Sequence, residues 1–180
     1  MTMLRTGDQM PDFSFDTPFE KGLRLSEVVK EVPGRTAVVF LRYYGCTLCQ
    51  YDIHLFKEGY DSIRGKDGQL LAVLQSDPEK LAAQIDKDSL PFRIACDPEQ
   101  ELYKLLDIKA AASMEDMLGP EAKEKIGKAR GMGFVHGEYE GEELQLPAAF
   151  ILDRDMKLHF VHYGKVVEDV PAVEELAANM

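Results

Sequence analysis

Two cysteines separated by two residues, Cys46 and Cys49, are the side chains of this sequence whose type and spacing are best suited to chemistry. A Cys-x-x-Cys pair can supply half of a zinc site, close a structural disulfide or act as a redox couple. Zinc would need two further ligands, and the four histidines are scattered, without a second paired motif. Three cysteines are too few for the disulfide framework of a small secreted protein. We therefore expect a redox couple and no metal site.

The pair follows a predicted strand and should begin a helix. Residues 36–41 form an apolar run of strand length, so Cys46 is expected near the N-terminus of the next helix and Cys49 one turn further on. Backbone N–H groups and the helix dipole at that end favour a thiolate and lower a thiol pKa from ~8.5 toward ~7 or below. Arg42 either adds a positive charge beside the pair or points to solvent. The tyrosines that precede the pair, including Tyr44, are expected to pack around the site.

Predicted strands continue to alternate with predicted helices after the cysteines. The apolar runs at 69–74 and 91–96 are typical of strands covered on both faces. Each run leads to an Asp-Pro pair, in which Asp77 or Asp97 is a predicted helix N-cap and the proline is the first helical residue. Gln100 stands where it can bond back to the second of these caps. The alternation predicts a parallel core sheet with right-handed crossovers.

The C-terminal third has a different pattern. Residues 148–152 and 156–163 are predicted to be two strands of an antiparallel hairpin, and a last helix is predicted to begin near 169–171. Between 107 and 147 no strand is evident, because 113–130 has a charged helical pattern and four glycines then mark an open loop. A connection of this length is usually functional, so we expect an insertion that flanks the site.

Length and composition narrow the class of protein. The 180 residues suffice for a single domain, 1–180, whose core needs no disulfide staples. A net charge of −11 disfavours nucleic acid and anionic membrane as partners through repulsion. Without an apolar leader or a run of 18 apolar residues, the protein is expected to be soluble and cytoplasmic. Cys96 ends a predicted buried strand and is more typical of a core cysteine than of a third redox partner.

The sequence resembles the alkyl hydroperoxide reductase/thiol-specific antioxidant family of the thioredoxin superfamily, in its peroxiredoxin-like branch that carries a Cys-x-x-Cys motif. The similar motifs extend over nearly the whole chain: G-x-x-x-P-D-F at 7–13, L-S-E at 25–27, D-P at 97–98, Q-L-P at 145–147 and F-I-L-D at 150–153. The resemblance implies a thioredoxin-like α/β fold, in which a central mixed sheet of parallel βαβ units and a C-terminal antiparallel hairpin is flanked by helices.

The resemblance also assigns roles at the site. Peroxiredoxins carry T-x-x-C-x-x-E there, and in that register Cys49 falls on the cysteine that attacks peroxide, Asp52 on the acidic position and Cys46 on the threonine. Pro147 occupies the place where thioredoxin folds carry a cis-proline beside the cysteines, although a proline that begins a strand is also ordinary. The residues predicted to support the two cysteines are Arg42, Tyr44, Thr47, Asp52 and Pro147.

Two departures from the family pattern leave the mechanism open. The peroxide-orienting threonine has become Cys46, and Pro147 stands where peroxiredoxins usually supply an arginine, for which Arg42 is a candidate substitute. In a peroxidase, Cys49 would attack peroxide and the resulting sulfenic acid would condense with Cys46. In a thioredoxin-like thiol–disulfide oxidoreductase, Cys46 would attack a disulfide and Cys49 would resolve the mixed disulfide. A non-enzymatic redox-sensing or interaction module is the third hypothesis.

The resemblance implies no cofactor. The expected partners are a peroxide, or a protein or small-molecule disulfide, together with an external thiol reductant such as thioredoxin, and a homodimer is left open.

Overall fold

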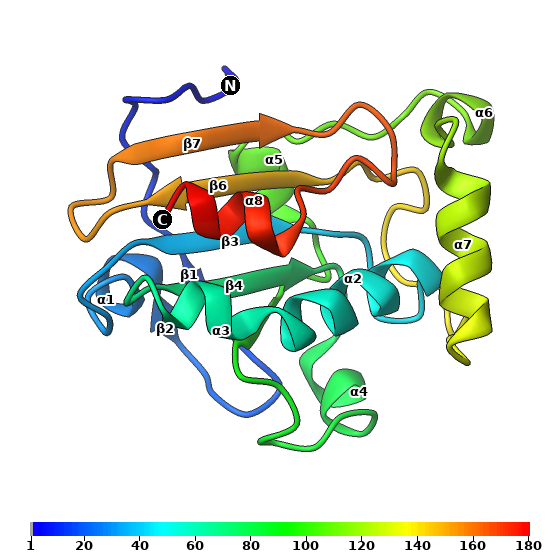
Figure 1. Ribbon diagram of the computed structural model, residues 1–180, viewed down its shortest axis with the longest axis horizontal. Helices are drawn as coiled ribbons and strands as arrows, with labels where there is room; N and C mark the ends of the chain where they lie inside the picture. Colours follow the sequence, from blue (N-terminus) through cyan, green and yellow to red (C-terminus); the bar gives the residue numbers. More distant parts are fainter. Residues whose placement is uncertain (1) are drawn as a thin grey trace.

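A five-stranded mixed sheet forms the centre of the molecule, and helices lie on both of its faces (Figure 1). The computed structural model describes residues 2–180. The strand order is β5-β4-β3-β6-β7; β3, β4 and β5 are parallel, whereas β6 runs antiparallel to β3 and β7 antiparallel to β6. The five strands are β3 (Thr36–Phe40), β4 (Gln69–Leu74), β5 (Arg93–Cys96), β6 (Ala148–Leu152) and β7 (Leu158–Tyr163). The predicted fold class, a thioredoxin-like mixed sheet between helices, is confirmed.

The helices are divided between the two faces of the sheet. In Figure 1, α2, α3 and α8 lie in front of the strands, and α1 and α5 lie behind them. The helices are α1 (Leu25–Val28), α2 (Thr47–Glu58), α3 (Tyr60–Arg64), α4 (Pro78–Ala82), α5 (Glu101–Leu105), α6 (Met114–Met117), α7 (Ala122–Gly131) and α8 (Val173–Ala178). None of the helices in residues 2–180 is both long and apolar enough to cross a membrane.

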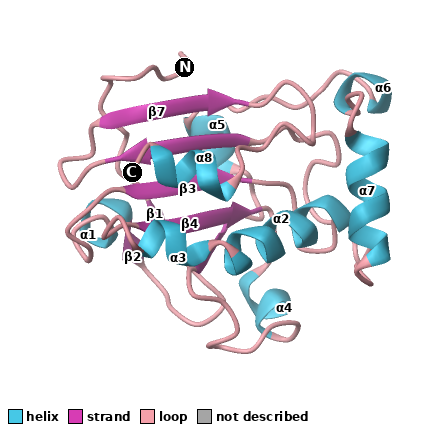
Figure 2. Cartoon of the chain, in the orientation of Figure 1, coloured by secondary structure: helices cyan, strands magenta, loops and turns pink. Residues whose placement is uncertain are grey.

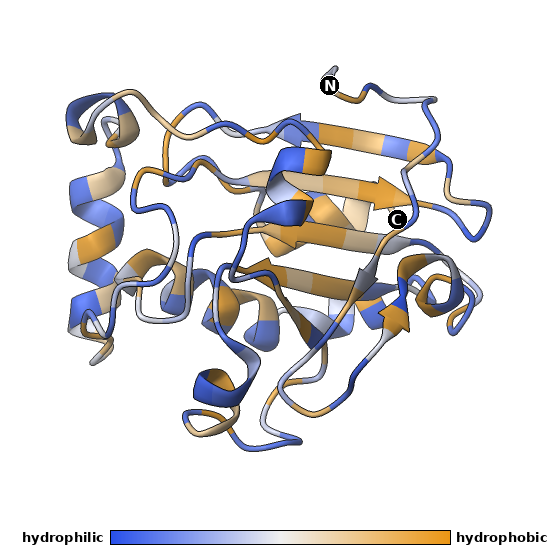
Figure 3. Ribbon diagram, turned by 180° about the vertical axis from the view of Figure 1, so that it is seen from behind, coloured by the Kyte–Doolittle hydropathy of each residue, from blue (hydrophilic) through white to orange (hydrophobic). Residues whose placement is uncertain are grey.

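The central strand β3 contributes to two separate hydrophobic cores. Successive side chains of a strand point to opposite faces, so Ala37 and Val39 join the core beneath α2, α3 and α8, while Val38 and Phe40 join the core on the opposite face. All four of these side chains are buried. This two-sided burial explains the continuous apolar run in the sequence, and Figure 3 shows it as hydrophobic colour along the central strands. The edge strand β7 is only partly buried along most of its length.

The predicted helix starts are correct at one Asp-Pro pair and wrong at the other. Asp77 is the N-cap of α4 and accepts hydrogen bonds from the N–H groups of Glu79 and Lys80. After Asp97, however, α5 begins only at Glu101, and Gln100 is its N-cap in a left-handed conformation (φ 60°) rather than a residue of the first turn. The Asp97 carboxylate still accepts from the first N–H groups of α5, so it caps the helix across a three-residue turn.

The region from 107 to 147, predicted to be an insertion and called the insertion below, is a mostly helical and irregular segment whose two ends meet. Ala110 and Gln145 form an isolated antiparallel bridge, and the N–H of Ala111 donates to the carbonyl of Leu144 (2.8 Å). Between them, α6 and α7 stand beyond the N-terminal end of α2, and a long loop returns to β6 (Figure 2). The predicted helical segment 113–130 is therefore two helices, because the Gly119-Pro120 pair separates α6 from α7.

A two-stranded hairpin near the N-terminus is absent from the sequence-based prediction. It consists of β1 (Ser14–Phe15) and β2 (Leu23–Arg24), which pair antiparallel. Strands of two residues are too short to show an alternating pattern.

Candidate functional site

Cys46 lies between the end of β3 and the first turn of α2. It is the N-cap of α2, and its Sγ accepts a hydrogen bond from the N–H of Cys49 (3.2 Å). A sulfur in this position receives the partial positive charge of the helix N-terminus. The predicted strand-to-helix setting of the pair is therefore present. The three cysteines of the chain are free thiols in this structure.

Arg42 points to the cysteines and not to solvent. Its Nη2 donates to Cys46 Sγ (3.1 Å), and its backbone N–H donates to Cys49 Sγ (3.4 Å). The residue is only 7% exposed. Among residues 2–180, the Nε of Arg42 has no hydrogen-bond partner. The guanidinium therefore keeps one buried donor without a partner.

The two thiols have opposite electrostatic environments. Burial alone would raise the pKa of Cys46, but hydrogen bonds from Cys49 and the positive charge of Arg42 outweigh burial and lower the pKa to about 7. Burial raises the pKa of Cys49 well above its usual value, and the neighbouring Cys46 sulfur adds to this effect. Of the two thiols, Cys46 is therefore the one that ionises more readily near neutral pH.

Glu143 connects the insertion to this site. Its Oε1 and its carbonyl oxygen both accept from Nη1 of Arg42, at 2.9 and 2.7 Å. Its Oε2 accepts from the Tyr43 hydroxyl at 2.5 Å, and that hydroxyl also lies 2.9 Å from Nε2 of His136. Burial, and then the hydrogen bond to Glu143, raise the pKa of Tyr43. Sequence reasoning missed Glu143 and His136, which lie about a hundred residues from the cysteines in a segment without a recognisable pattern.

The loop of residues 132–143, here called the covering loop, closes over the N-terminal end of α2. The N–H of Gly137 donates to the carbonyl of Gly45 (2.8 Å), and Nε2 of Gln50 donates to the carbonyl of Val135 (2.9 Å). A side chain at position 45 would collide with the loop backbone at Gly137 and Glu138. Cys46 is 0% exposed beneath this contact.

Within residues 2–180, the side chains of the other predicted supporting residues make no hydrogen bond to either cysteine sulfur. Thr47 is the buried first residue of α2. Tyr44 is half-buried against the core, and its backbone N–H donates to Oγ of Ser76 (3.0 Å). The carboxylate of Asp52 pairs with Nζ of Lys125 in α7 at 2.6 Å.

Asp52 is buried rather than solvated. Its residue is 4% exposed, and burial raises the pKa of its carboxyl group even though Lys125 opposes the shift. The pair joins α2 to α7, so the acidic position anchors the insertion to the helix that carries the cysteines.

Pro147 occupies the place of the cis-proline of thioredoxin folds, but the peptide bond that precedes it is not cis. The peptide bonds described in residues 2–180 contain no cis bond, so the bond before Pro147 is trans. Pro147 is buried immediately before β6, and its carbonyl accepts from the N–H of Gly164 (2.8 Å). This is the ordinary placement of a proline ahead of a strand.

Cys96 occupies the predicted core position. It is buried at the end of β5, and burial raises the pKa of its thiol to about 12. Its N–H donates to the carbonyl of Asp16 (2.8 Å).

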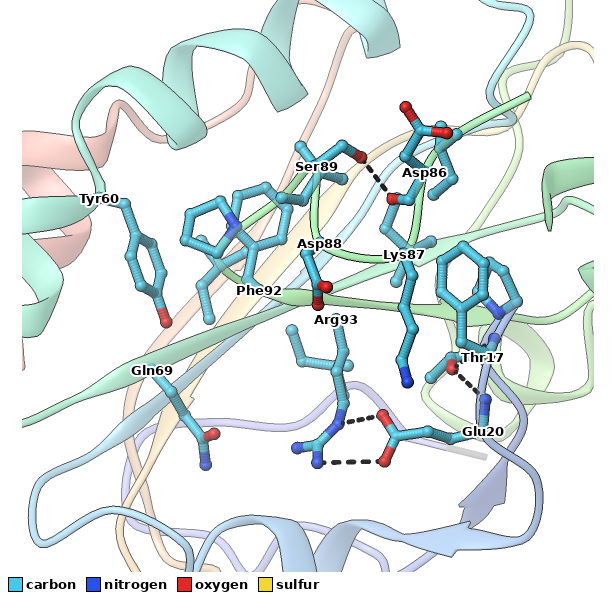
Figure 4. Close-up of a pocket in the computed structure, with 18 of the residues that line it drawn as sticks. Thr17, Glu20, Tyr60, Gln69, Asp86, Lys87, Asp88, Ser89, Phe92 and Arg93 are labelled. Carbon is cyan, nitrogen blue, oxygen red and sulfur yellow. Dashed lines mark hydrogen bonds and ion pairs between the residues drawn. The ribbon is translucent and has the colours of Figure 1, made fainter. Parts of the chain in front are cut away.

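Within the part of the chain that the structure describes, no cluster of three or more histidine, cysteine, aspartate or glutamate side chains is arranged to hold a metal ion. A cavity of about 470 Å³ lies elsewhere, between the β5 edge of the sheet, α3 and the loop after β1 (Figure 4). Arg93, which lines this cavity, is paired with Glu20 and Glu31. None of the cysteines lines it, so it is separate from the thiol chemistry.

A mixed sheet with a Cys-x-x-Cys pair at the end of its central strand defines a thioredoxin-fold thiol protein. Residues 6–161 match the family model described as the AhpC/TSA family, and the chain belongs to that family. The predicted family is therefore confirmed, and membership supports a thiol redox function.

Known proteins with similar sequence or structure agree with this family. The chain is 27% identical over 136 residues to peroxiredoxin-like 2C from Mus musculus, a match that spans 71% of this chain and 60% of the mouse protein. The structure of peroxidoxin BcpB from Mycobacterium tuberculosis gives a TM-score of 0.62 at 15% identity, over 99% of this chain and 92% of that one. Reduced 2-Cys peroxiredoxin from Plasmodium vivax gives a TM-score of 0.64 at 10% identity, over 96% and 78% of the two chains. At these identities the solved structures show the fold.

Proposed function

We propose that this protein is a thiol peroxidase in which Cys46 attacks the peroxide and Cys49 resolves the product. The observation that carries the proposal is the contact between Arg42 and the Cys46 sulfur, at 3.1 Å, in a site where Cys49 is held as a thiol. A thiolate, not a thiol, is the attacking species. Family membership supports a peroxide as the substrate.

The reaction begins at the sulfur of Cys46. The thiolate attacks one oxygen of the peroxide, the O–O bond breaks, and the second oxygen leaves as water or an alcohol after taking a proton. Cys46 is thereby oxidised to a sulfenic acid. The guanidinium of Arg42, whose Nη2 contacts the Cys46 sulfur, supplies positive charge beside the reacting atoms during this step. The sulfur of Cys49 then attacks the Cys46 sulfur as the Cys49 thiol gives up its proton. An S–S bond forms, the S–O bond breaks, and the departing hydroxide takes that proton and leaves as water. An external dithiol reductant restores both thiols.

This assignment reverses the roles that the peroxiredoxin register gives to the two cysteines. In that register Cys49 stands at the attacking position. The Cys49 thiol is buried and its pKa is raised, which disfavours the thiolate that the register requires. Burial of Cys46 beneath the covering loop favours a small peroxide over a protein disulfide.

Stopped-flow reaction of the reduced protein with hydrogen peroxide tests the proposal, with each cysteine replaced by serine in turn. We expect Cys46→Ser to abolish rapid peroxide consumption, because the attacking sulfur is lost. Cys49→Ser should keep the first step and accumulate a sulfenic acid that dimedone traps at Cys46. Cys96→Ser serves as the matched control and should behave as the unmodified protein.

The opposite pattern, rapid consumption that survives Cys46→Ser and is lost in Cys49→Ser, would overturn the proposal and restore the register of the family.

Thiol–disulfide exchange is the second candidate. The observation that favours it is the placement of Cys46 as the helix N-cap with Cys49 one turn behind, which suits attack on a disulfide followed by resolution. Slow reaction with peroxide, combined with rapid reduction of a disulfide that depends on Cys46, would establish this activity in place of the peroxidase.

A further inference from the structure

We propose that Glu143 is a positioning residue, which holds the guanidinium of Arg42 against the Cys46 sulfur from the covering loop. This inference rests on the proposed role of Cys46 as the attacking thiolate. It gives the insertion a part in thiol activation.

The contacts of Arg42 come from opposite sides of its guanidinium. Nη1 donates twice to Glu143, once to the side-chain Oε1 and once to the backbone carbonyl, and Nη2 donates to Cys46. A guanidinium is planar and rigid, so fixing one of its nitrogens fixes the direction of the others. In the ion pair between Arg42 and Glu143, the arginine side chain is 9% exposed and the glutamate side chain 32%, so the arginine end of the pair is buried.

Glu143 is itself held by two further groups. The hydroxyl of Tyr43 donates to Oε2 and is also within hydrogen-bond distance of His136 in the same loop. The neighbouring residue Glu142 is fixed at its N–H by Oε1 of Gln75 (2.8 Å). The carboxylate therefore has a defined direction, which a positioning role requires.

A purely structural role for Glu143 would be to neutralise a buried arginine. That role predicts a loss of folding stability on replacement and no specific change at Cys46. A purely electrostatic effect predicts that removing the negative charge lowers the pKa of Cys46. Positioning predicts the reverse, because an arginine without its anchor moves away from the thiolate and the pKa rises.

Titration of the Cys46 thiolate in the reduced protein, followed by its ultraviolet absorbance, separates these effects. Glu143→Ala removes the side-chain anchor, and we expect the Cys46 pKa to rise by about 1 unit. Glu143→Gln keeps an amide oxygen that accepts from Arg42, and its Cys46 pKa should not exceed that of the unmodified protein. Glu138→Ala removes the same charge from the same loop, where its partner is the exposed Lys80, and is the matched control.

A fall or no change in the Glu143→Ala protein, or an equal rise in the Glu143→Gln protein, would overturn the inference. Should Glu143→Ala fail to fold, Tyr43→Phe frees Oε2 alone, and a smaller rise in the Cys46 pKa is then expected; no rise would count against positioning. The titration needs no substrate. A protein that reacts with neither peroxide nor disulfide but shows these shifts would refute the proposed function and leave the positioning role intact.

Discussion

At the scale of single residues, the site separates two chemically identical thiols. The sulfur of Cys46 accepts hydrogen bonds from the backbone N–H of Cys49 and from the guanidinium of Arg42. The sulfur of Cys49 accepts a hydrogen bond from the backbone N–H of Arg42. The environment therefore favours the thiolate at Cys46 over the thiolate at Cys49. The two sulfurs also differ in position, because Cys46 is the N-cap of α2 and Cys49 lies in its first turn.

The pKa of Cys46, about 7, predicts the pH dependence of its reactivity. The thiolate fraction rises as pH rises through the pKa, so alkylation of Cys46 by iodoacetamide should accelerate with a midpoint near pH 7. Arg42→Met removes the adjacent positive charge and should move the midpoint up by about 1–2 pH units. Mass spectrometry of the alkylated peptides identifies the site. Preferential labelling of Cys49, or a midpoint for Cys46 near that of an ordinary thiol, would contradict the asymmetry.

The sequence permits prediction of only part of this residue network. Cys46, Cys49 and Arg42 lie within eight residues of each other, so one strand followed by one helix is sufficient to bring them together. Glu143 reaches Arg42 across 101 residues, through a loop whose path depends on tertiary contacts. An acidic residue in an acidic loop carries no signal of such a contact.

At the scale of elements, the covering loop and the N-terminal end of α2 form one unit. The loop meets Gly45 backbone to backbone, and this close approach is possible only because position 45 lacks a side chain. The strands around it were predictable from continuous apolar runs. The loop was not, because its glycines indicate an irregular path without indicating where that path leads.

Replacing Gly45 should expose the buried thiol. In Gly45→Ala the new methyl group collides with the loop backbone and destabilises the closed conformation of the covering loop. Each destabilisation by about 1.4 kcal/mol raises the population of the open conformation about tenfold. We expect Cys46 to react at least several-fold faster with a bulky maleimide. Gly131→Ala, at the end of α7 with no neighbouring atom in its way, is the matched control and should not change the rate. An unchanged rate in folded Gly45→Ala protein would show that the loop does not limit access.

At the scale of the whole molecule, the net charge of −11 acts on partners and not on the fold. Hydrogen peroxide is uncharged, so its reaction rate should change little with salt. A thioredoxin-type reductant of net negative charge is repelled, and screening by salt should accelerate reduction of the oxidised protein by up to about tenfold. Stopped-flow rates over a sodium chloride series test this, with uncharged dithiothreitol as the control reductant. A rate that falls with added salt would indicate a local basic docking surface instead.

The global arrangement followed from the sequence more completely than the site did. Strands buried on both faces produce long apolar runs, and parallel neighbours require helices between them, so the central sheet could be predicted. The start of α5 could not be predicted. Asp97 and the following proline indicate an N-cap, but they do not indicate the turn after which the helix begins at Glu101. The division of the insertion into α6 and α7 likewise depends on local backbone geometry at 119–120.

The ion pair between Asp52 and Lys125 makes α2 and α7 energetically dependent on each other. A buried carboxylate that loses its cation costs several kcal/mol, so neither partner is readily replaced alone. The helix that carries the cysteines and the helix that precedes the covering loop are therefore coupled through one pair of charges.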